Sequence, residues 1–273
     1  MTMFAYLYRM LSNSQQKLIR ALQQKKQRDR EQLFVLEGDK TISDLIASNE
    51  LTLENTLLIA ATEVWAEGRL AGDKELVAKL EVTPPEILKK ISSLQTPPEA
   101  LAVVRIPVRT FDPPQLKKEI TLAFDRIRDP GNLGTVIRTA DWFGAMHIIC
   151  STDSVDQYNS KVVQASMGSI LRVQTHYMDL EKLFFNASRL KVPVYGTTMD
   201  GEDLYETPVK NPSVILFGNE SSGIDPHYEK AFKAKLRIPD HPPGRSGSES
   251  LNVASSVAVI CSEMRRRDRL YSK

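Results

Sequence analysis

The chain has 273 residues, 41% of them hydrophobic, which is enough for two ordinary domains that each bury a core and excludes a disordered chain. Its 36 basic and 34 acidic side chains give a net charge of +2, so overall charge does not by itself indicate a nucleic-acid partner. The two cysteines, Cys150 and Cys261, lack the spacing of a metal site, and we expect buried thiols in a reducing compartment and no metal. Residues 1–10 are too short to span a bilayer and show no cleavage-site pattern, which predicts a cytoplasmic protein without a membrane segment.

Basic residues gather in two short segments of the chain. They are Lys17, Arg20, Lys25, Lys26, Arg28 and Arg30 near the N-terminus, and Arg265, Arg266, Arg267 and Arg269 near the C-terminus. Such clusters either contact nucleic-acid phosphates or form solvated helix faces, and a charge run considered alone favours the second interpretation.

The first part of the chain alternates short apolar runs, such as LFVLE, TLLIA and ALAVVRI, with helix-like segments such as TISDLIAS. This alternation predicts a small α/β domain over residues 1–106. Within it, the sequence TPPE at residues 83–86 has the capping threonine, the prolines and the glutamate of a helix start. Three prolines among polar neighbours then predict an interdomain linker over residues 107–118.

Residues 119–273 repeat the alternation with the apolar runs ITLAFD, MHIIC, VPVYGTT, SVILFG and AKLRIP. Runs that are apolar without strict alternation are typical of a parallel sheet that helices cover on both faces. The predicted fold class is therefore α/β, with a mostly parallel sheet in the second domain.

Three segments at the ends of predicted strands carry residues suited to chemistry. The first reads DRIRDPGNLGTVIRTADWFG, and it predicts a helix from about Leu133 to Gly144, with Asn132 at its mouth and Arg138 one to two turns in. Open α/β sheets bind ligands at the carboxyl edge where this segment lies. Taken alone, a turn followed by a surface arginine explains the segment better than a site does.

The second segment, ILFGNESSGI, places Glu220 between Gly218 and Gly223, and glycine allows close approach of a ligand to the backbone. It lacks the Lys-Ser/Thr pair of a phosphate loop, and no G-x-G-x-x-G follows a strand, so neither an NTPase nor a dinucleotide enzyme is expected. An ordinary glycine-rich turn is the alternative. In the third segment, a polar loop leads from Ile238 to SLNVASSVAVICSEMRRR, where Ser250 is expected to cap a core or dimerisation helix.

Taken together, DPGNLGTVIRTADWFGA, ILFGNESSGI, and IP followed by SLNVASS resemble the three signature motifs of the TrmH-like (SpoU) family of SPOUT RNA 2′-O-ribose methyltransferases. The resemblance implies a deep trefoil knot in the C-terminal domain, S-adenosylmethionine as the cofactor and a homodimer. It further implies that the N-terminal domain binds RNA, with ribosomal RNA favoured over transfer RNA.

By motif position, the resemblance also implies the site residues. The methyl-transfer site would contain Asn132, Arg138, Glu220, Ser250 and Asn252. The cofactor would be held by Thr197, Gly218, Asn219, Ile238 and Leu251.

Methyl transfer to a hydroxyl requires a positioned nucleophile and a proton acceptor. A guanidinium stays protonated in almost any protein environment, so we expect Arg138 to bind the target phosphate and to stabilise negative charge. Glu220 is expected either to exchange a proton or to fix Asn132 and the loop backbone. The rival functions are a noncatalytic RNA-binding or ribosome-assembly factor of the same fold and, less favoured, a small-molecule α/β enzyme.

Overall fold

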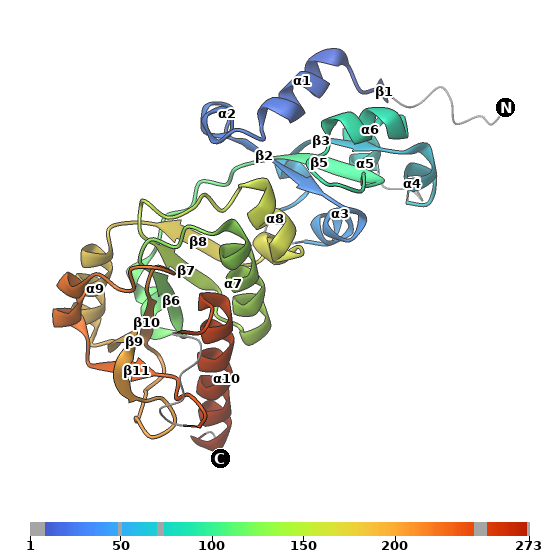
Figure 1. Cartoon of the computed structure of the whole chain (residues 1–273). Helices are drawn as coiled ribbons and strands as arrows, with labels where there is room; N and C mark the ends of the chain where they lie inside the picture. The colour runs from blue at the N-terminus through green and yellow to red at the C-terminus, as the bar shows by residue number, and fades with distance from the viewer. Residues whose placement is uncertain (1–8, 49–50, 70–73, 243–249, 272–273) are drawn as a thin grey trace. The chain divides into compact units, whose positions relative to one another are not determined.

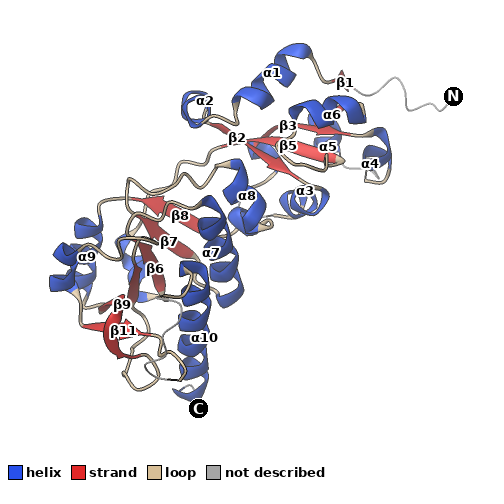
Figure 2. Ribbon diagram, viewed as in Figure 1, coloured by secondary structure: helices blue, strands red, loops and turns tan. Residues whose placement is uncertain are grey.

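The computed structural model describes residues 9–48, 51–69, 74–242 and 250–271 (Figures 1 and 2). The chain divides into two compact units, which we call unit 1 and unit 2. Unit 1 is Met1–Val108 with Tyr158–Arg172, and unit 2 is Arg109–Gln157 with Val173–Lys273.

Unit 1 is built on a mixed five-stranded sheet in the order β1-β4-β3-β5-β2. Strand β4 pairs parallel with β1 and β3, and β5 pairs antiparallel with β2 and β3. The strands are β1 (Arg9–Met10), β2 (Leu33–Glu37), β3 (Thr56–Ala61), β4 (Leu80–Val82) and β5 (Ala100–Arg105). The helices are α1 (Asn13–Ala21), α2 (Lys25–Glu31), α3 (Asp39–Ile46), α4 (Glu63–Glu67), α5 (Lys74–Lys79), α6 (Pro85–Ile91) and α8 (Ser160–Ser166), with short 3-10 helices at Leu53–Asn55 and Ser169–Leu171.

Helices α1 and α6 cover one face of this sheet with their apolar sides. Ile19 and Leu22 at the end of α1 and Leu88 of α6 are buried in one core cluster with sheet residues that include Leu101 and Val103. Burial of each such side chain contributes about 1.5–3 kcal/mol to folding. The opposite sides of α1 and α6 consequently face solvent.

Unit 2 contains a six-stranded sheet in the order β11-β9-β10-β6-β7-β8, in which every pair is parallel. The strands are β6 (Thr121–Phe124), β7 (His147–Cys150), β8 (Gln174–Tyr177), β9 (Val194–Asp203), β10 (Val214–Phe217) and β11 (Ala234–Arg237). The helices are α7 (Pro130–Phe143), α9 (Leu180–Leu190) and α10 (Val253–Tyr271), with 3-10 helices at Pro113–Lys117 and Pro226–Ala231.

Helices cover both faces of the parallel sheet, α9 on one face and the packed pair α7 and α10 on the other (Figure 2). Phe184 of α9 is buried in a cluster that includes Ile149 of β7 and Leu216 of β10, and Val136 and Ile137 of α7 are fully buried. The predicted α/β class with a parallel second sheet is confirmed. The trefoil knot stays a prediction, and residues 243–249 on its path lie outside the described part of the chain.

The structure differs from the sequence-based expectations in several places. The segment Tyr158–Arg172 groups with unit 1 although residues 119–273 were expected to form one domain, because α8 packs on β2 and the Tyr158 ring lies 4.4 Å from that of Phe34. Strand β8 has polar letters, QTHY, and no apolar run predicts it. Thr83 does not cap α6, since its hydroxyl donates instead to the Glu81 carbonyl at 2.9 Å.

Along the described residues, no helix combines the length and apolar content that crossing a bilayer requires.

Candidate functional site

Two neighbouring strands of unit 2 bring the first and second motif segments together. Phe124, the last residue of β6, lies opposite Phe217, the last residue of β10, and their rings stack with centroids 5.3 Å apart. The loops that follow therefore leave the carboxyl edge of the sheet side by side. Buried Asp125 links them, because its Oδ2 accepts a hydrogen bond of 2.8 Å from the backbone N–H of Asp225.

The first loop is held by Arg126 in an unusual backbone conformation. Its φ of 56° lies in the left-handed region, which residues other than glycine rarely adopt. Its backbone N–H donates to Ser151 Oγ at 2.8 Å, and its guanidinium donates to both oxygens of Asp125 at 2.8 and 2.9 Å. The hydrogen bonds to Asp125 raise the pKa of Arg126. These contacts fix the turn that leads into α7.

The second loop is organised by Asn219. Its Nδ2 donates to the carbonyl of Arg126 at 2.7 Å, and its Oδ1 accepts from the backbone N–H groups of Ser221 and Ser222 at 3.0 and 3.1 Å. The backbones of Asn219 and Gly223 also exchange two hydrogen bonds. A Cβ on Gly218 would lie 2.4 Å from the Gly223 carbonyl carbon, so only glycine permits this tight return of the chain.

A chain of hydrogen bonds connects all three motif segments. Asn132 Nδ2 donates to Glu220 Oε1 at 3.0 Å, and Asn252 Nδ2 donates to Asn132 Oδ1 at 2.8 Å. Glu220 Oε1 also accepts from the backbone N–H of Asp129 at 3.4 Å, and Oε2 accepts from Asn219 Nδ2 at 3.4 Å. Residues far apart in the sequence thus meet in one cluster, and Glu220 takes the pinning position that was one of its two expected roles.

Helix α7 presents Asn132 and Arg138 from one rigid element. It begins at Pro130, three residues earlier than predicted, because the Asp129 side chain caps it by accepting from the Asn132 backbone N–H at 2.8 Å. Arg138 is exposed and, within the described residues, makes no hydrogen bond or ion pair. Its guanidinium is available to an anion.

The other predicted site residues lie on β9, directly after β11 and just before α10. Thr197 on β9 donates to the Leu216 carbonyl at 3.1 Å, Ile238 directly follows β11 and is half-buried, and Leu251 is 53% exposed. Ser250, predicted to cap the last helix, is exposed and lies three residues before that helix begins. Helix α10 begins at Val253, and Asn252 caps it by accepting from the Ala254 backbone N–H at 2.9 Å.

Three of the four arginines in the predicted C-terminal cluster, Arg265, Arg266 and Arg267, have partners within the chain. Arg265 donates to the carbonyls of Phe143 and Gly144 at the end of α7 at 2.7 and 3.0 Å. Buried Arg267 donates to two carbonyls between β9 and β10 and to Glu263. Arg266 and Arg267 lower the pKa of Glu263 to about 2. Sequence spacing carries no signal for such capping of carbonyls by side chains.

The structure adds two positions that the sequence interpretation did not single out. Arg126 and Arg128 line an open depression together with Asn219, Ser221 and Ser222, and Arg128 is exposed with no partner among the described residues. The only signal in the sequence was a pair of basic letters inside the first motif segment.

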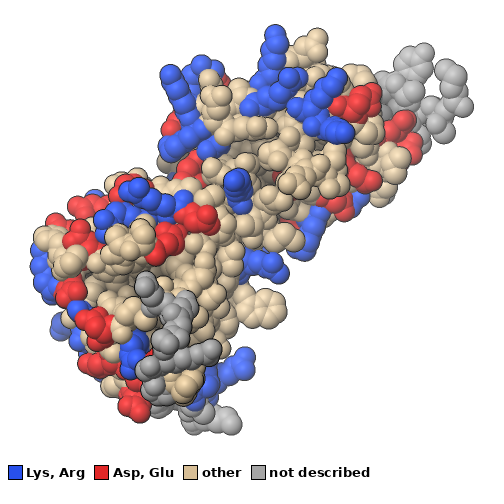
Figure 3. All heavy atoms as spheres, viewed as in Figure 1, with Lys and Arg blue, Asp and Glu red and all other residues tan. Residues whose placement is uncertain are grey.

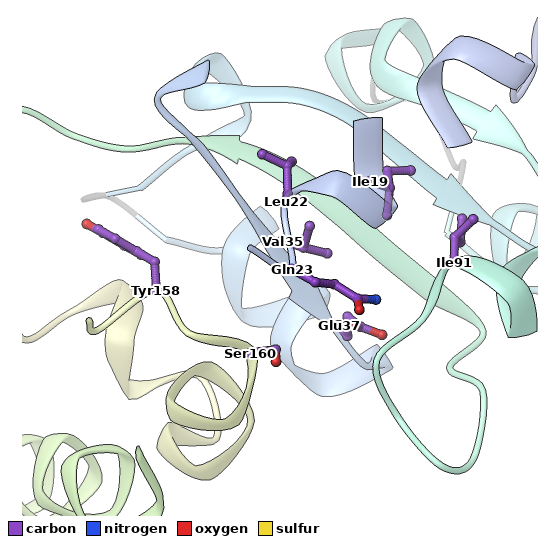
Figure 4. Close-up of a pocket in the computed structure, with 8 residues that line it drawn as sticks. All are labelled: Ile19, Leu22, Gln23, Val35, Glu37, Ile91, Tyr158 and Ser160. Atoms are coloured by element: carbon purple, nitrogen blue, oxygen red, sulfur yellow. The ribbon is translucent and has the colours of Figure 1, made fainter. Parts of the chain in front are cut away.

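A second hollow, in unit 1, offers no comparable chemistry. It lies between α1, β2 and the start of α8, and its lining includes Ile19, Val35 and Tyr158 (Figure 4). Its volume of about 10 Å³ has room for roughly one water molecule. Across the described chain, no group of three or more His, Cys, Asp or Glu side chains could hold a metal ion.

Models of known protein families match two stretches of this chain. Residues 119–262 match the SpoU rRNA Methylase family, and residues 13–102 match the MRM3-like substrate binding domain. The chain is 26% identical over 245 residues to the 23S rRNA (guanosine(2553)-2'-O)-methyltransferase RlmP of Bacillus subtilis, covering 89% of this chain and 93% of that protein.

Solved structures agree over nearly the whole length. A putative RNA methyltransferase of the TrmH family from Porphyromonas gingivalis is 34% identical, with a TM-score of 0.82 and coverage of 94% of this chain and 99% of that one. An AdoMet-bound rRNA methyltransferase from Sinorhizobium meliloti is 29% identical, with a TM-score of 0.77 and coverage of 95% and 97%. On these matches and on the cluster of Asn132, Glu220 and Asn252, the chain belongs to the SpoU rRNA methylase family.

Proposed function

We propose that this chain transfers a methyl group from S-adenosylmethionine to a ribose 2′-hydroxyl of ribosomal RNA. The observation that carries the proposal is the hydrogen-bonded cluster of Asn132, Glu220 and Asn252, one residue from each motif segment, in a member of this family. Both full-length relatives described above that are named by substrate act on ribosomal RNA. A relative named for transfer RNA, from Thermus thermophilus, matches only 55% of this chain.

The edge of the cluster suits an adenosine-type cofactor. Gly218 lacks a side chain where the loop returns on itself, Leu251 is an apolar side chain left 53% exposed, and Ile238, directly after β11, is half-buried. An exposed aliphatic group and backbone polar groups together recognise an adenine ring without charge. We assign cofactor contacts to these residues and to Thr197 and Asn219. When bound, S-adenosylmethionine supplies a methyl group activated by its sulfonium.

The residues of the cluster have distinct tasks in this reaction. Both ends of the Asn132 amide are engaged, so its orientation is fixed by Glu220 and Asn252 before substrate arrives. Glu220 acts as a positioning residue for Asn132. Arg138 stays protonated and binds a phosphate of the target nucleotide, where it also stabilises the negative charge that develops on the attacking oxygen. Ser250 and Asn252 orient the ribose.

We also propose that the chain works as a homodimer through unit 2. Trp142 is 85% exposed on α7, on the same outer stripe as Arg138 and Thr135, since these positions are three to seven residues apart. A large exposed aromatic side chain is typical of an interface. Light scattering after gel filtration should give twice the chain mass, and Trp142→Glu should give a monomer with reduced activity. A fully active monomeric wild type would contradict the dimer.

The function is tested by incubating the protein with labelled S-adenosylmethionine and total RNA from cells that lack it. We expect label in one large ribosomal RNA species. Arg138→Ala should reduce transfer by at least a hundredfold and leave cofactor affinity within about twofold, because Arg138 contacts the RNA and not the cofactor. Cofactor binding without transfer to any RNA would favour the noncatalytic factor instead.

A further inference from the structure

Unit 1 carries exposed cations that have no acidic partner. Some of its other exposed basic residues are paired within the unit, as in Lys25 with Asp29, Arg30 with Glu31 and Lys40 with Asp44, whereas Arg9, Lys74, Arg105 and Lys161 are exposed without an ion pair among the described residues. Another group is exposed and, within the described residues, makes no ion pair. It consists of Lys17, Arg20, Lys26, Lys89 and Lys90, which we call the basic face.

The fold gathers the basic face from three helices. Lys17 and Arg20 are three residues apart on α1 and therefore share one side of that helix, opposite to buried Ile19 and its neighbours in the core. Lys89 and Lys90 lie in the last turn of α6, which packs against α1. In the space-filling view, blue side chains gather over α1, α2 and α6 (Figure 3).

No negative charge interrupts α1 or the turn that follows it. From Ser12 to Arg28 the sequence contains no Asp or Glu, and its other polar residues are Ser, Asn and Gln. Ser12, Asn13, Gln23 and Gln24 are exposed. Cations interspersed with neutral amides and hydroxyls match a sugar-phosphate backbone, because amides and hydroxyls bind 2′-hydroxyls and phosphate oxygens without repelling them.

We propose that the basic face binds the phosphate backbone of structured RNA, independently of base sequence, and so supplies substrate affinity to the methyl-transfer site. This inference rests on the proposed function. Each of the cations would neutralise about one phosphate. Among the described residues, α1, α2 and α6 contribute no exposed large apolar side chain, whereas an anionic membrane surface is bound by helices with an apolar side.

The test compares two variants of the full chain with the same change in net charge. The first carries Lys17→Gln, Arg20→Gln, Lys26→Gln, Lys89→Gln and Lys90→Gln. The control carries Lys182→Gln, Arg189→Gln, Lys191→Gln, Lys210→Gln and Lys233→Gln, at exposed positions of unit 2 without ion pairs among the described residues. Both should bind S-adenosylmethionine like the wild type and melt at the same temperature, because every changed side chain is exposed.

Binding to total ribosomal RNA and to an RNA duplex of arbitrary sequence is measured between 50 and 200 mM salt. We expect the first variant to lose at least tenfold in affinity for both RNAs near 150 mM salt and its slope of log K against log salt to be smaller by about 4, whereas the control stays within about twofold. The KM for RNA should rise and the single-turnover rate at saturating RNA should stay unchanged.

Equal affinities and slopes for the two variants would overturn the proposal that the basic face binds RNA, while leaving the proposed function intact. Tighter binding of the wild type to phosphatidylglycerol vesicles than to RNA would also overturn it, in favour of a membrane. If the wild type methylates no RNA but the charge dependence of binding holds, the proposed function fails and the RNA-binding face stands.

Discussion

The carboxylate of Glu220 offers the sharpest test of how the cluster works. Its Oε1 accepts from Asn132 at 3.0 Å and from the Asp129 backbone at 3.4 Å, and its Oε2 accepts from Asn219 at 3.4 Å. The substitution Glu220→Gln keeps the shape but removes the charge. The new amide nitrogen must face a donor on one side, either Asn132 or Asn219.

The expected size follows from the hydrogen bonds that are lost. A bond to a charged acceptor contributes about 1.5–3 kcal/mol and a bond to a neutral acceptor about 0.5–1.5 kcal/mol. Because Glu220 is exposed, the low end of each range applies. The hydrogen bond that orients Asn132 therefore weakens by ~1 kcal/mol. Since about 1.4 kcal/mol is a factor of ten, the rate of methyl transfer should fall about fivefold. Glu220→Ala, which removes the acceptors altogether, loses about 1.5 kcal/mol or more and should lower the rate about tenfold or more.

The assay is single-turnover transfer of labelled methyl to the RNA target, with cofactor affinity measured by calorimetry. The matched control is Glu206→Gln, since Glu206 is an exposed carboxylate that makes no side-chain hydrogen bond with the described residues. An unchanged rate in Glu220→Gln would refute the positioning role. A loss of a thousandfold or more together with a lost pH dependence would refute it too, because that pattern identifies a proton acceptor.

Three further predictions concern stability and the loop. Arg267→Leu removes the buried partner of Glu263 and of two carbonyls and should lower the free energy of unfolding in urea by about 3 kcal/mol. Arg266→Leu, at an exposed side chain, should lower it by under about 1 kcal/mol, and equal losses would contradict the stabilising role of Arg267. Gly218→Ala should lower both the unfolding free energy, by about 2 kcal/mol, and cofactor affinity, since the new Cβ meets backbone at 2.4 Å; an unchanged cofactor affinity would contradict the tight loop. Burial, with smaller effects of nearby positive charge, lowers the pKa of His176 to about 4, below its unfolded value. The stability that the neutral imidazole contributes is therefore fully present above about pH 6.5 and is lost as the pH falls towards 4. The melting temperature of the wild type should fall over that range more than that of His176→Leu, and parallel pH curves would contradict this.

Most strands of both sheets could be predicted because a short apolar run indicates a strand with buried side chains. The run LFVLE forms β2, an edge strand whose Phe34 and Leu36 are buried, and the run SVILFG contains β10, whose four residues are all buried. Strand β8 was missed because QTHY packs through a buried threonine and histidine and lacks an apolar run. Residues Tyr158–Arg172 group with unit 1 through a long-range contact between Tyr158 and Phe34, which a local sequence pattern cannot show.

The candidate site could be predicted as a set of residues but not as a geometry. Motif position singled out Asn132, Glu220 and Asn252, and the structure brings them into direct contact. Their order in that chain of hydrogen bonds depends on how separate strand ends meet in space. The same limit explains why the sequence suggested only solvated helix faces or phosphate contacts for Arg265 and Arg267, although both donate to carbonyls of their own chain.

The central claim is that the cluster of unit 2 directs a methyl group to a ribose oxygen. The most direct measurement is alkaline digestion of ribosomal RNA labelled by the wild-type protein, because a methylated 2′-oxygen cannot attack the adjacent phosphodiester. We predict that the label is recovered in a single alkali-resistant dinucleotide and is absent when Arg138→Ala replaces the wild type. Label recovered in mononucleotides, as base methylation would give, would contradict the account.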